Sequence, residues 1–239
     1  MKALRIEGLG KRFKGVEALR GVSLEVTDGE VVGIVGANGA GKTTLFNTLC
    51  GIIPPDTGSI RLHGHEISGL APHMICKRGI GRAFQITRPF LNLTCLENVT
   101  IGALNRAPSA ARARESAMTV LAQVGLDDKA EMLGRELSVG WRKRLELARA
   151  LASRPKVLLL DEVLAGLNEA EVDEMVRLLP TLTEGMTVLI IEHVIQAVLQ
   201  LCRRAVFMQA GSVLVDGATN EVMNDPVVID SYLGSESKC

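Results

Sequence analysis

The feature that most constrains the fold of this chain is a glycine-rich segment between a predicted strand and a predicted helix. Residues 30–35 form a nearly continuous apolar run, which is typical of a parallel strand buried on both faces. The segment that follows reads Gly36-Ala-Asn-Gly-Ala-Gly-Lys-Thr43 and fits the pattern G-x-x-x-x-G-K-[ST]. A helix is expected over residues 42–50, closed by Gly51. This order of strand, loop and helix predicts an α/β fold with a phosphate-binding loop.

The loop contains the groups that a nucleoside triphosphate requires. Its glycines allow successive backbone N–H groups to converge on phosphate oxygens, and the helix N-terminus adds the positive end of its dipole. Lys42 is expected to reach the β- and γ-phosphates, and the Thr43 hydroxyl is expected to ligate Mg²⁺. A plain glycine-rich turn accounts for the glycines but not for the Lys-Thr pair. We therefore expect the nucleotide to contact a continuous set of loop residues, namely Gly36, Asn38, Gly39, Ala40, Gly41, Lys42, Thr43 and Thr44.

A second chemical feature is a pair of carboxylates at the end of another apolar strand. Asp161 and Glu162 directly follow the run Val-Leu-Leu-Leu at residues 157–160. In open α/β sheets, ligands bind beyond the carboxyl ends of the strands. Asp161 is therefore a candidate to hold Mg²⁺, directly or through water, and Glu162 is a candidate general base for an attacking water. The alternative is that both are solvated carboxylates at a strand end.

The periodicity of the chain changes along its length. Alternation with period two predicts strands at residues 4–9 and 22–26, and a further strand is expected at 59–63. Residues 94–152 are rich in Ala, Leu, Arg and Glu, which are good helix formers. The helices expected there lie at residues 94–102, 109–124 and 141–152.

After Pro155 the pattern becomes βαβ. Strands are expected at 157–161 and 187–192, and the apolar face of the helix between them contains Val172, Met175, Val176 and Leu179. A second amphipathic helix follows, and then a hairpin of residues 205–208 and 212–215 that turns at Ala210-Gly211. Alternating strands and helices predict a mostly parallel sheet.

Composition excludes several classes of protein. Lys+Arg and Asp+Glu both number 27, so the formal net charge is zero, which argues against a protein that neutralises many nucleic-acid phosphates. No run approaches the ~18–20 continuous apolar residues that span a bilayer. The N-terminus lacks the apolar core of a secretory signal, so we expect a cytoplasmic location and no more than a peripheral membrane role. The five cysteines form no C-x-x-C pair, which predicts reduced, mostly buried thiols.

Further motifs occur at spacings that identify a family. Leu137-Ser-Val-Gly-Trp141 resembles the LSGGQ signature of the nucleotide-binding subunits of ABC transporters, and the helix-forming residues 142–151 after it are also similar. Gln85 matches the Q-loop of these subunits, Ala165-Gly-Leu-Asn168 their D-loop, and Glu192-His193 their switch histidine. The resemblance covers essentially the whole chain, with the motifs in the order of the family.

The resemblance implies a fold and a division of the chain. We expect an α/β P-loop NTPase core with a mostly parallel sheet, a small antiparallel β subdomain and an inserted α-helical subdomain. The chain 1–239 then forms a single ABC ATPase domain. Residues 1–87 and 153–239 supply the core with its β subdomain, and residues 88–152 the helical signature subdomain.

The resemblance also implies a mechanism. Two copies pack head to tail, and each ATP lies between the phosphate loop of one copy and Ser138 and Gly140 of the other. The implied catalytic residues are Glu162, His193, Gln85 and Lys42, and the implied Mg²⁺ ligands are Thr43, Gln85 and Asp161. Phe13 stands where the family has an aromatic residue that stacks on adenine, with packing in the small β lobe as the alternative.

Two residues depart from the signature, and others have a structural interpretation. Val139 replaces a glycine and Trp141 replaces the usual polar residue, so we expect hydrolysis to be retained but slowed. The basic residues of 142–149 are interpreted as a solvated helix face with Glu146. The segment 88–98 contains Phe90, Leu91, Leu93 and Leu96, which suit contact with membrane subunits or local packing of the helical lobe.

Within the family, the segment around Gln85, the D-loop and the tail 231–234 resemble the branched-chain amino acid uptake group. The expected function is that of an ATP-hydrolysing importer subunit for such amino acids or similar small polar solutes. The implied partners are transmembrane permease subunits, a second ABC ATPase subunit and, indirectly, a solute-binding protein, with ATP and Mg²⁺ as cofactors. One alternative is a soluble ABC ATPase that acts on nucleic acid or ribosomes. A subunit that binds ATP without hydrolysis is a further alternative, against which Glu162 and His193 argue.

Overall fold

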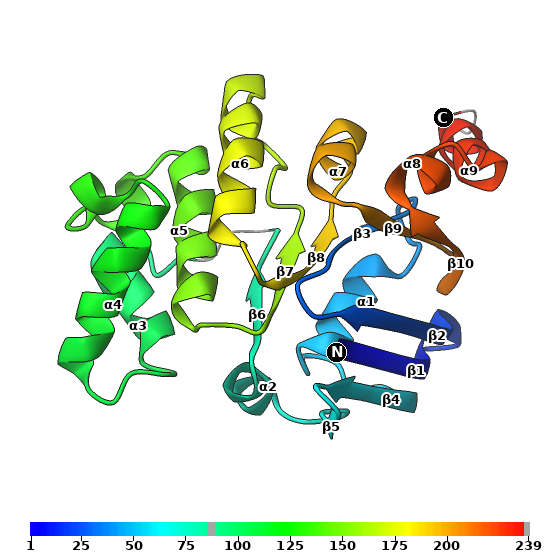
Figure 1. Cartoon of the computed structure of the whole chain (residues 1–239), viewed down its shortest axis with the longest axis horizontal. Helices are drawn as coiled ribbons and strands as arrows, with labels where there is room; N and C mark the ends of the chain where they lie inside the picture. Colours follow the sequence, from blue (N-terminus) through cyan, green and yellow to red (C-terminus); the bar gives the residue numbers. More distant parts are fainter. Residues whose placement is uncertain (86–88, 237–239) are drawn as a thin grey trace. The chain divides into compact units, whose positions relative to one another are not determined.

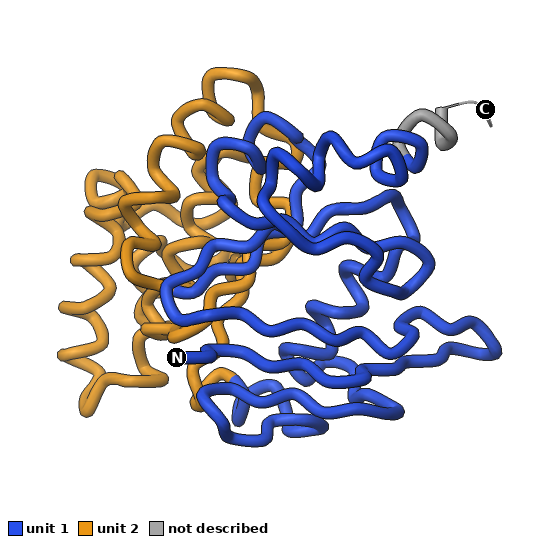
Figure 2. Tube along the Cα trace, turned by 45° about the vertical axis from the view of Figure 1, so that its right-hand side comes forward, with its two compact units in different colours: residues 1–75, 187–239 blue, residues 76–186 orange. Residues whose placement is uncertain are grey.

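The computed structural model describes residues 1–85 and 89–236, with side chains described up to residue 231. The described chain divides into two compact units, one of residues 1–75 and 187–239 and the other of residues 76–186 (Figure 2). Each unit combines strands with helices (Figure 1). The expected boundary between core and helical subdomain at residues 87 and 88 lies outside the described residues, and the single-domain organisation stays a prediction.

The first unit contains most of the strands. Its elements are β1 (Lys2–Phe13), β2 (Val16–Thr27), β3 (Val31–Val35), α1 (Lys42–Leu49), β4 (Thr57–Leu62), β5 (His65–Glu66), β8 (Thr187–Ile191), α7 (Ile195–Leu201), β9 (Arg204–Gln209), β10 (Ser212–Ala218), α8 (Thr219–Met223) and α9 (Pro226–Glu236). The short helix α2 (Pro72–Arg78) contains the point at which this unit passes into the next.

Four strands of this unit form the small antiparallel sheet, in the order β2-β1-β4-β5. Leu4 and Ile6 of β1 are buried, as the period-two pattern predicts, and Leu9 is buried three residues further on, because the pairing with β2 shifts register between Ile6 and Leu9. The strands at 4–9 and 22–26 are confirmed, but β1 and β2 are longer because they pair with each other as a hairpin beyond the apolar residues.

The remaining strands of this unit lie in the order β10-β9-β3-β8, with β3 parallel to both β8 and β9. β3 is almost completely buried, which agrees with its continuous apolar sequence. The predicted hairpin of β9 and β10 is confirmed, and its turn residues Ala210 and Gly211 have φ of 46° and 84°. Positive φ at both positions is the geometry of a type I′ turn, which matches the twist of the strands.

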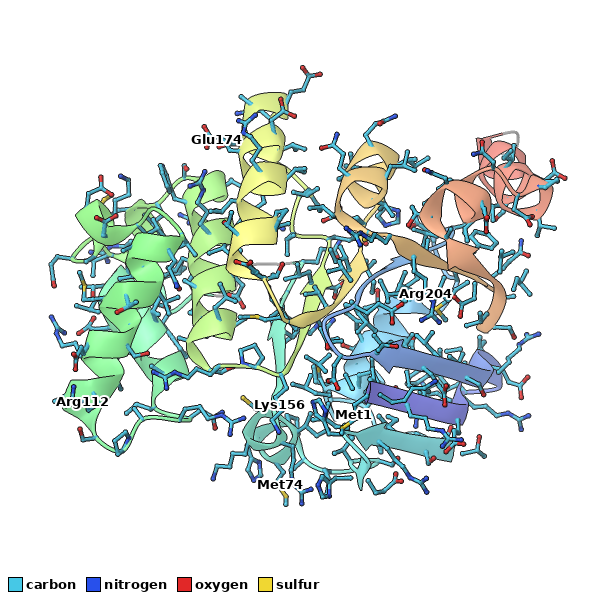
Figure 3. All side chains as sticks on the ribbon, viewed as in Figure 1. Met1, Met74, Arg112, Lys156, Glu174 and Arg204 are labelled. Atoms are coloured by element: carbon cyan, nitrogen blue, oxygen red, sulfur yellow. The ribbon has the colours of Figure 1, made fainter. Side chains whose placement is uncertain are left out.

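Arg204, which is labelled in Figure 3, contacts three segments of the first unit. Its guanidinium binds Asp216 of β10 at 2.6 Å and Glu30 beside β3 at 3.0 Å, and it also donates to the carbonyl of Glu25 in β2. These carboxylates hold the pKa of Arg204 above its usual range, with the Asp216 hydrogen bond as the largest cause. The antiparallel hairpin is thereby tied to the strand that leads into the phosphate loop.

The second unit contains the predicted helices and two parallel strands. Its elements are β6 (Ile80–Ala83), α3 (Cys95–Ala103), α4 (Ala110–Gln123), the 3₁₀ turns Asp127–Lys129 and Gly134–Glu136, α5 (Val139–Ala152), β7 (Val157–Asp161) and α6 (Glu169–Leu182). β6 pairs in parallel with β7, and α3 packs against both α4 and α5. The predicted α/β fold with mostly parallel strands and a small antiparallel sheet is confirmed.

Helix starts follow the capping residues. Thr94, Ser109 and Asn168 each accept a backbone N–H through the side chain at the start of α3, α4 and α6. Ser138 does the same for α5, so this helix begins two residues before the predicted start. The sequence prediction missed the cap because the residue after it, Val139, is exposed and falls outside the apolar periodicity.

Several short elements have no clear sequence signal. These elements are α2, β5, β6, α8 and α9. β6 is only four residues long and contains a glycine and an arginine, so its pairing with β7 rather than its composition makes it a strand. Within residues 1–85 and 89–236, no helix has the length and apolar character required to cross a membrane.

Burial of the cysteines predicts their reactivity. Cys50, Cys95 and Cys202 are buried, as expected, while Cys76 is partly exposed. Burial raises the pKa of Cys95 to about 11 and of Cys202 to about 12, with the charge of Glu192 contributing at Cys202. At pH 8 the thiolate fraction of Cys202 is therefore roughly one in ten thousand.

In a Cys239→Ser background, we expect iodoacetamide at pH 8 to label Cys76 first and to label Cys95 and Cys202 only after addition of denaturant. Peptide mass spectrometry measures the order of labelling. Rapid labelling of Cys202 in the folded protein would contradict the burial described above.

Candidate functional site

The phosphate loop lies between β3 and α1, in the setting that the sequence predicts. Gly36 and Gly41 have φ of 148° and 102°, which favour glycine. A Cβ at Gly36 would lie 2.2 Å from the carbonyl oxygen of Met208, and one at Gly41 would lie 2.6 Å from that of Ala18. By contrast, no atom of the described residues lies within 4 Å of a Cβ added at Gly39, so the crest of the loop has open space for a ligand.

The N-terminus of α1 is available to an anion. Gly41 is the N-cap residue and makes no side-chain hydrogen bond to the helix. Lys42 is buried, and its Nζ donates to the carbonyl oxygens of Gly36 at 2.6 Å and Ala37 at 3.1 Å. These contacts hold the ammonium over the loop, where the helix dipole and the glycine amides also favour negative charge. The geometry fits a nucleotide phosphate.

His193 reaches the same edge of the first unit through strand pairing. β3 and β8 are parallel neighbours, with Ile34 opposite Ile191. The loop after β3 and the segment Glu192-His193 after β8 therefore start at the same end of adjacent strands. Glu192 is buried, whereas His193 is exposed.

Phe13 lies at the end of β1, where 42% of its surface is exposed. Its ring is 5.5 Å from the Nζ of Lys11 and is not part of the hydrophobic core. The alternative of a packed strand aromatic is therefore not what the structure shows. The exposed ring is free to stack on a planar ligand, which keeps its adenine role as a proposal.

In the second unit, Gln85 and Glu162 meet because β6 and β7 are parallel. Ala83 near the end of β6 pairs with Leu160 near the end of β7. Gln85 and Glu162 each follow their strand by one or two residues, and the Gln85 amide donates to the Glu162 carboxylate. Glu162 has φ of 48°, a left-handed conformation that costs roughly 1–2 kcal/mol for a residue with a side chain. Strain at this carboxylate is typical of a functional position.

Asp161 is buried at the end of β7 beside Arg82 of β6. Their side chains are only 3% and 5% exposed and form a salt bridge. Arg82 also lies over the ring of Phe84 at 4.5 Å, so it connects β7 with the residue before Gln85. The other carboxylate oxygen, Oδ1 of Asp161, is buried without a hydrogen-bond partner within the described part of the chain. An orphaned carboxylate oxygen fits a Mg²⁺ ligand.

The signature residues lie at the start of α5. Ser138 is the exposed N-cap residue, and its Oγ accepts the N–H of Trp141. Gly140 is buried, and a Cβ there would lie 2.5 Å from Oε1 of Glu171. The same Glu171 forms a capping box with Asn168 of the predicted D-loop at 3.0–3.1 Å. The carboxylate that caps the helix after the D-loop therefore also lies close to Gly140 of the signature.

The ring of Trp141 lies next to two cations. Nζ of Lys129 lies 4.6 Å from its ring and the guanidinium of Arg144 lies 4.9 Å from it. Arg144 also binds Glu174 of α6 at 2.5 Å. The indole replaces a hydrogen-bonding group of the signature but is fixed in place by cation–π contacts.

The loop that follows the Q-loop exposes apolar side chains on a backbone that hydrogen bonds hold in place. Asn98 is completely buried and bonds both the N–H and the carbonyl of Phe90, at 2.8 and 3.0 Å. Phe90 and Leu91 are nevertheless 46% and 48% exposed, whereas Leu96 is buried in the helical packing. Arg88, the first residue of the expected segment, lies outside the described residues.

The prediction that the charged residues of α5 form a solvated face is wrong. Lys143 and Glu146 are 6% and 5% exposed, and Glu146 binds Arg149 at 2.8 Å. α5 packs against α3, α4 and β6, so more than one of its sides is covered. Arg82, Lys143 and Glu171 lie against predicted site residues. No sequence motif marks these three residues as part of the candidate site, and only their neighbours in the fold do.

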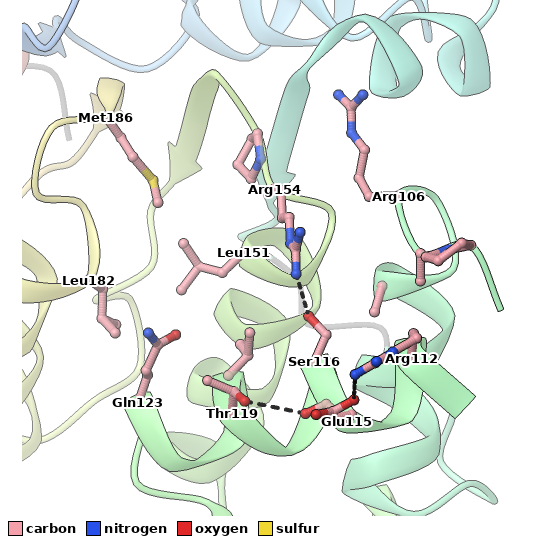
Figure 4. Close-up of a pocket in the computed structure, with 15 residues that line it drawn as sticks. Arg106, Arg112, Glu115, Ser116, Thr119, Gln123, Leu151, Arg154, Leu182 and Met186 are labelled. Carbon is pink, nitrogen blue, oxygen red and sulfur yellow. Dashed lines mark hydrogen bonds and ion pairs between the residues drawn. The ribbon is translucent and has the colours of Figure 1, made fainter. Parts of the chain in front are cut away.

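A separate cavity of about 630 Å³ lies along α4 in the second unit (Figure 4). Its lining includes none of the predicted site residues. Its polar groups bond one another: Arg112 binds Glu115 at 2.7 Å and Arg154 contacts Ser116 at 3.4 Å. This cavity is not part of the candidate site.

The structure therefore assembles two groups of predicted residues. The first unit contains Phe13, the phosphate loop with Lys42, and His193, while the second contains Gln85, Ser138, Gly140, Asp161 and Glu162. Within the second unit Gln85 contacts Glu162 directly. That the two groups serve nucleotides together is a proposal, developed below.

Comparison with known proteins gives extensive similarity. The family described as ABC transporter matches residues 19–165, more than half of the chain. BraF of Pseudomonas aeruginosa, a high-affinity branched-chain amino acid transport ATP-binding protein, is 38% identical over 97% of both chains. LptB of Haemophilus influenzae, a lipopolysaccharide export system ATP-binding protein, is 37% identical over 100% of both chains.

Solved structures show the same fold. The ADP conformation of MJ1267, an ATP-binding cassette of an ABC transporter, has a TM-score of 0.87 and 31% identity over 98% of this chain and 99% of that one. A dimeric post-hydrolysis structure of the cassette MJ0796, bound to ADP and Pi, has a TM-score of 0.82 and 28% identity over 90% of this chain and 98% of that one.

The Arg82–Asp161 pair predicts a double-mutant result. Arg82→Met leaves Asp161 buried without its cation, so we expect the free energy of unfolding to fall by about 3–5 kcal/mol. Adding Asp161→Asn removes the stranded charge and is expected to recover most of this loss. Urea denaturation of the single and double variants measures the coupling, and additive losses would show that the two side chains do not stabilise each other.

Proposed function

The chain belongs to the ABC transporter family, whose ATP-binding cassettes are ATPases, and we propose that it powers an importer for branched-chain amino acids or similar small polar solutes. The observation that best supports ATP hydrolysis is the hydrogen bond from the Gln85 amide to the Glu162 carboxylate at the ends of β6 and β7. It places an oriented carboxylate where open α/β sheets bind their ligands. A regulatory subunit without a base would lack this arrangement.

Binding and chemistry use different parts of the chain in this proposal. The glycine amides, the N-terminus of α1 and Lys42 bind the ATP phosphates, and Phe13 stacks on adenine. Glu162 accepts a proton from the attacking water, Gln85 orients this carboxylate, and His193 contacts the γ-phosphate. The strained backbone at Glu162 supports its role because such strain is retained where function needs it.

The residues present also suit Mg²⁺. Thr43, Gln85 and Asp161 supply hydroxyl, amide and carboxylate oxygens, which are the ligands that this ion prefers. The unpartnered Oδ1 of Asp161 supports its assignment to the metal. When bound, Mg²⁺ would neutralise phosphate charge during hydrolysis.

A second ATPase chain completes each site in this proposal. Ser138 and the amide of Gly140 lie at the N-terminus of α5, which is an anion-binding arrangement. The dimeric form of MJ0796 bound to ADP and Pi supports such pairing here. The partner is a paralogue or an identical chain.

Permease subunits are the proposed route to the membrane. Phe90 and Leu91 are exposed while Asn98 fixes their backbone, a combination suited to a firm protein contact. We propose that the chain is cytoplasmic and peripheral on the inner face of the membrane, with a solute-binding protein and permeases selecting the solute. An action on nucleic acid has less support, because the net charge is zero and the relatives named above are transport proteins.

The direction of transport has two candidates. Similarity to BraF favours branched-chain amino acid transport, and the nearly equal similarity to LptB favours an export motor as the second candidate. We prefer import because the segments around Gln85, the D-loop and the tail all resemble the uptake group.

The composite site predicts trapped dimers. Glu162→Gln removes the base, so we expect MgATP turnover to fall about 100-fold or more while ATP still binds. The variant should then shift from monomer to dimer on size exclusion with MgATP, and adding Ser138→Arg should abolish the shift. A monomer that binds ATP would point to a paralogue as the second half, whereas unchanged turnover would exclude Glu162 as the base.

The solute proposal predicts an uptake defect. In cells that lack this gene, we expect initial uptake of labelled leucine, isoleucine and valine to fall about tenfold and to be restored by the wild-type chain but not by Glu162→Gln. A normal rate would exclude these amino acids. A lipopolysaccharide defect in the same cells would instead support the export role.

A further inference from the structure

Lys143 is a buried cation that none of the proposed chemical steps uses. It lies in the second turn of α5 and is only 6% exposed. Its Nζ donates to the carbonyl oxygen of Gln85 at 2.7 Å and to that of Glu162 at 3.1 Å. Burial of an ammonium is costly unless strong hydrogen bonds compensate it, and these two contacts provide such hydrogen bonds.

The contacts of Lys143 close a ring. Its two carbonyl acceptors belong to the two residues whose side chains also bond each other, through the amide of Gln85 and the carboxylate of Glu162. The backbone and the side chain of each residue are therefore both held. A ring of three hydrogen bonds restricts the carboxylate more than the Gln85 contact alone.

The backbone at Glu162 requires this support. Its φ of 48° is unfavourable for a residue with a side chain, and its carbonyl is the acceptor at the start of a tight turn. The N–H of Ala165 donates to the same carbonyl at 3.2 Å. Lys143 and Ala165 together therefore hold the peptide of Glu162 in the conformation that presents its side chain to Gln85.

We propose that Lys143 is a positioning residue for hydrolysis. It holds the main chain of Gln85 and Glu162 so that the carboxylate is oriented before ATP arrives. This inference rests on the proposed function, in which Glu162 is the base. Because Ser138 caps the same helix, Lys143 also ties the signature end of α5 to the catalytic carboxylate.

Kinetics test the positioning role. Lys143→Met keeps the length of the side chain but removes the donors, so we expect kcat for MgATP to fall about tenfold to 100-fold while KM and the Kd for ATP change less than about twofold. Lys143→Arg retains a cation with several donors and is expected to recover turnover to within about threefold of wild type. A loss of binding rather than of kcat would overturn the proposal.

Leu147→Ala is the matched control for lost packing. Leu147 is buried one turn further along α5 and makes no polar contact with either carbonyl. All variants are assayed at a temperature where circular dichroism shows them folded. Under these conditions we expect Leu147→Ala to keep kcat within about twofold of wild type. An equal loss of kcat in Leu147→Ala and Lys143→Met would reduce Lys143 to a packing residue and overturn the proposal.

Hydrogen exchange provides a readout that does not need catalysis. We expect the Ala165 amide to exchange about tenfold faster in Lys143→Met than in wild type, with little change in Leu147→Ala. Unchanged exchange would show that Lys143 does not hold the turn and would overturn the proposal whatever the kinetics. If wild type and Glu162→Gln hydrolyse ATP equally, the proposed function fails, but the exchange result still decides whether Lys143 holds this backbone.

Discussion

The parallel pairing of strands is the constraint on which the rest of this structure depends. Pairing of β6 with β7 brings Gln85 and Glu162 to one edge, and pairing of β3 with β8 brings the phosphate loop and His193 to another common edge. Parallel strands have their carboxyl ends together, so residues far apart in sequence meet without any local signal. The placement of the candidate site residues is therefore a consequence of strand pairing.

Two buried cations, Arg82 and Lys143, contact the residues at the ends of β6 and β7. Arg82 compensates Asp161, while Lys143 holds the carbonyls of Gln85 and Glu162. Both cations pay a desolvation penalty that their hydrogen bonds offset. As a result, the two carboxylates at the end of β7 have different surroundings. Arg82 neutralises Asp161, whose Oδ1 has no hydrogen-bond partner among the described residues, and this suits a metal ligand. Glu162 is oriented by an amide, which suits a base.

The sequence predicts the main elements well where periodicity and capping agree. The strand at 157–161 and the hairpin turn at Ala210-Gly211 match the structure, because an apolar run and a positive-φ turn are local properties. The short strand β6 has no sequence signal because its pairing with β7, not its composition, makes it a strand. The interpretation of Lys143 and Glu146 as solvated was wrong because α5 has neighbours on several sides.

By itself the sequence determined the phosphate loop, the acidic strand end, the signature and the family, because each is a short pattern of residue types at a fixed spacing. Only the tertiary structure decided that Arg82 neutralises Asp161, that Glu171 lies against Gly140 and that Lys143 holds the backbone of Glu162. These contacts join residues that are distant in sequence and depend on burial. A single sequence contains no local pattern for such contacts or for burial, because contacts and burial arise only when the helices and strands pack together.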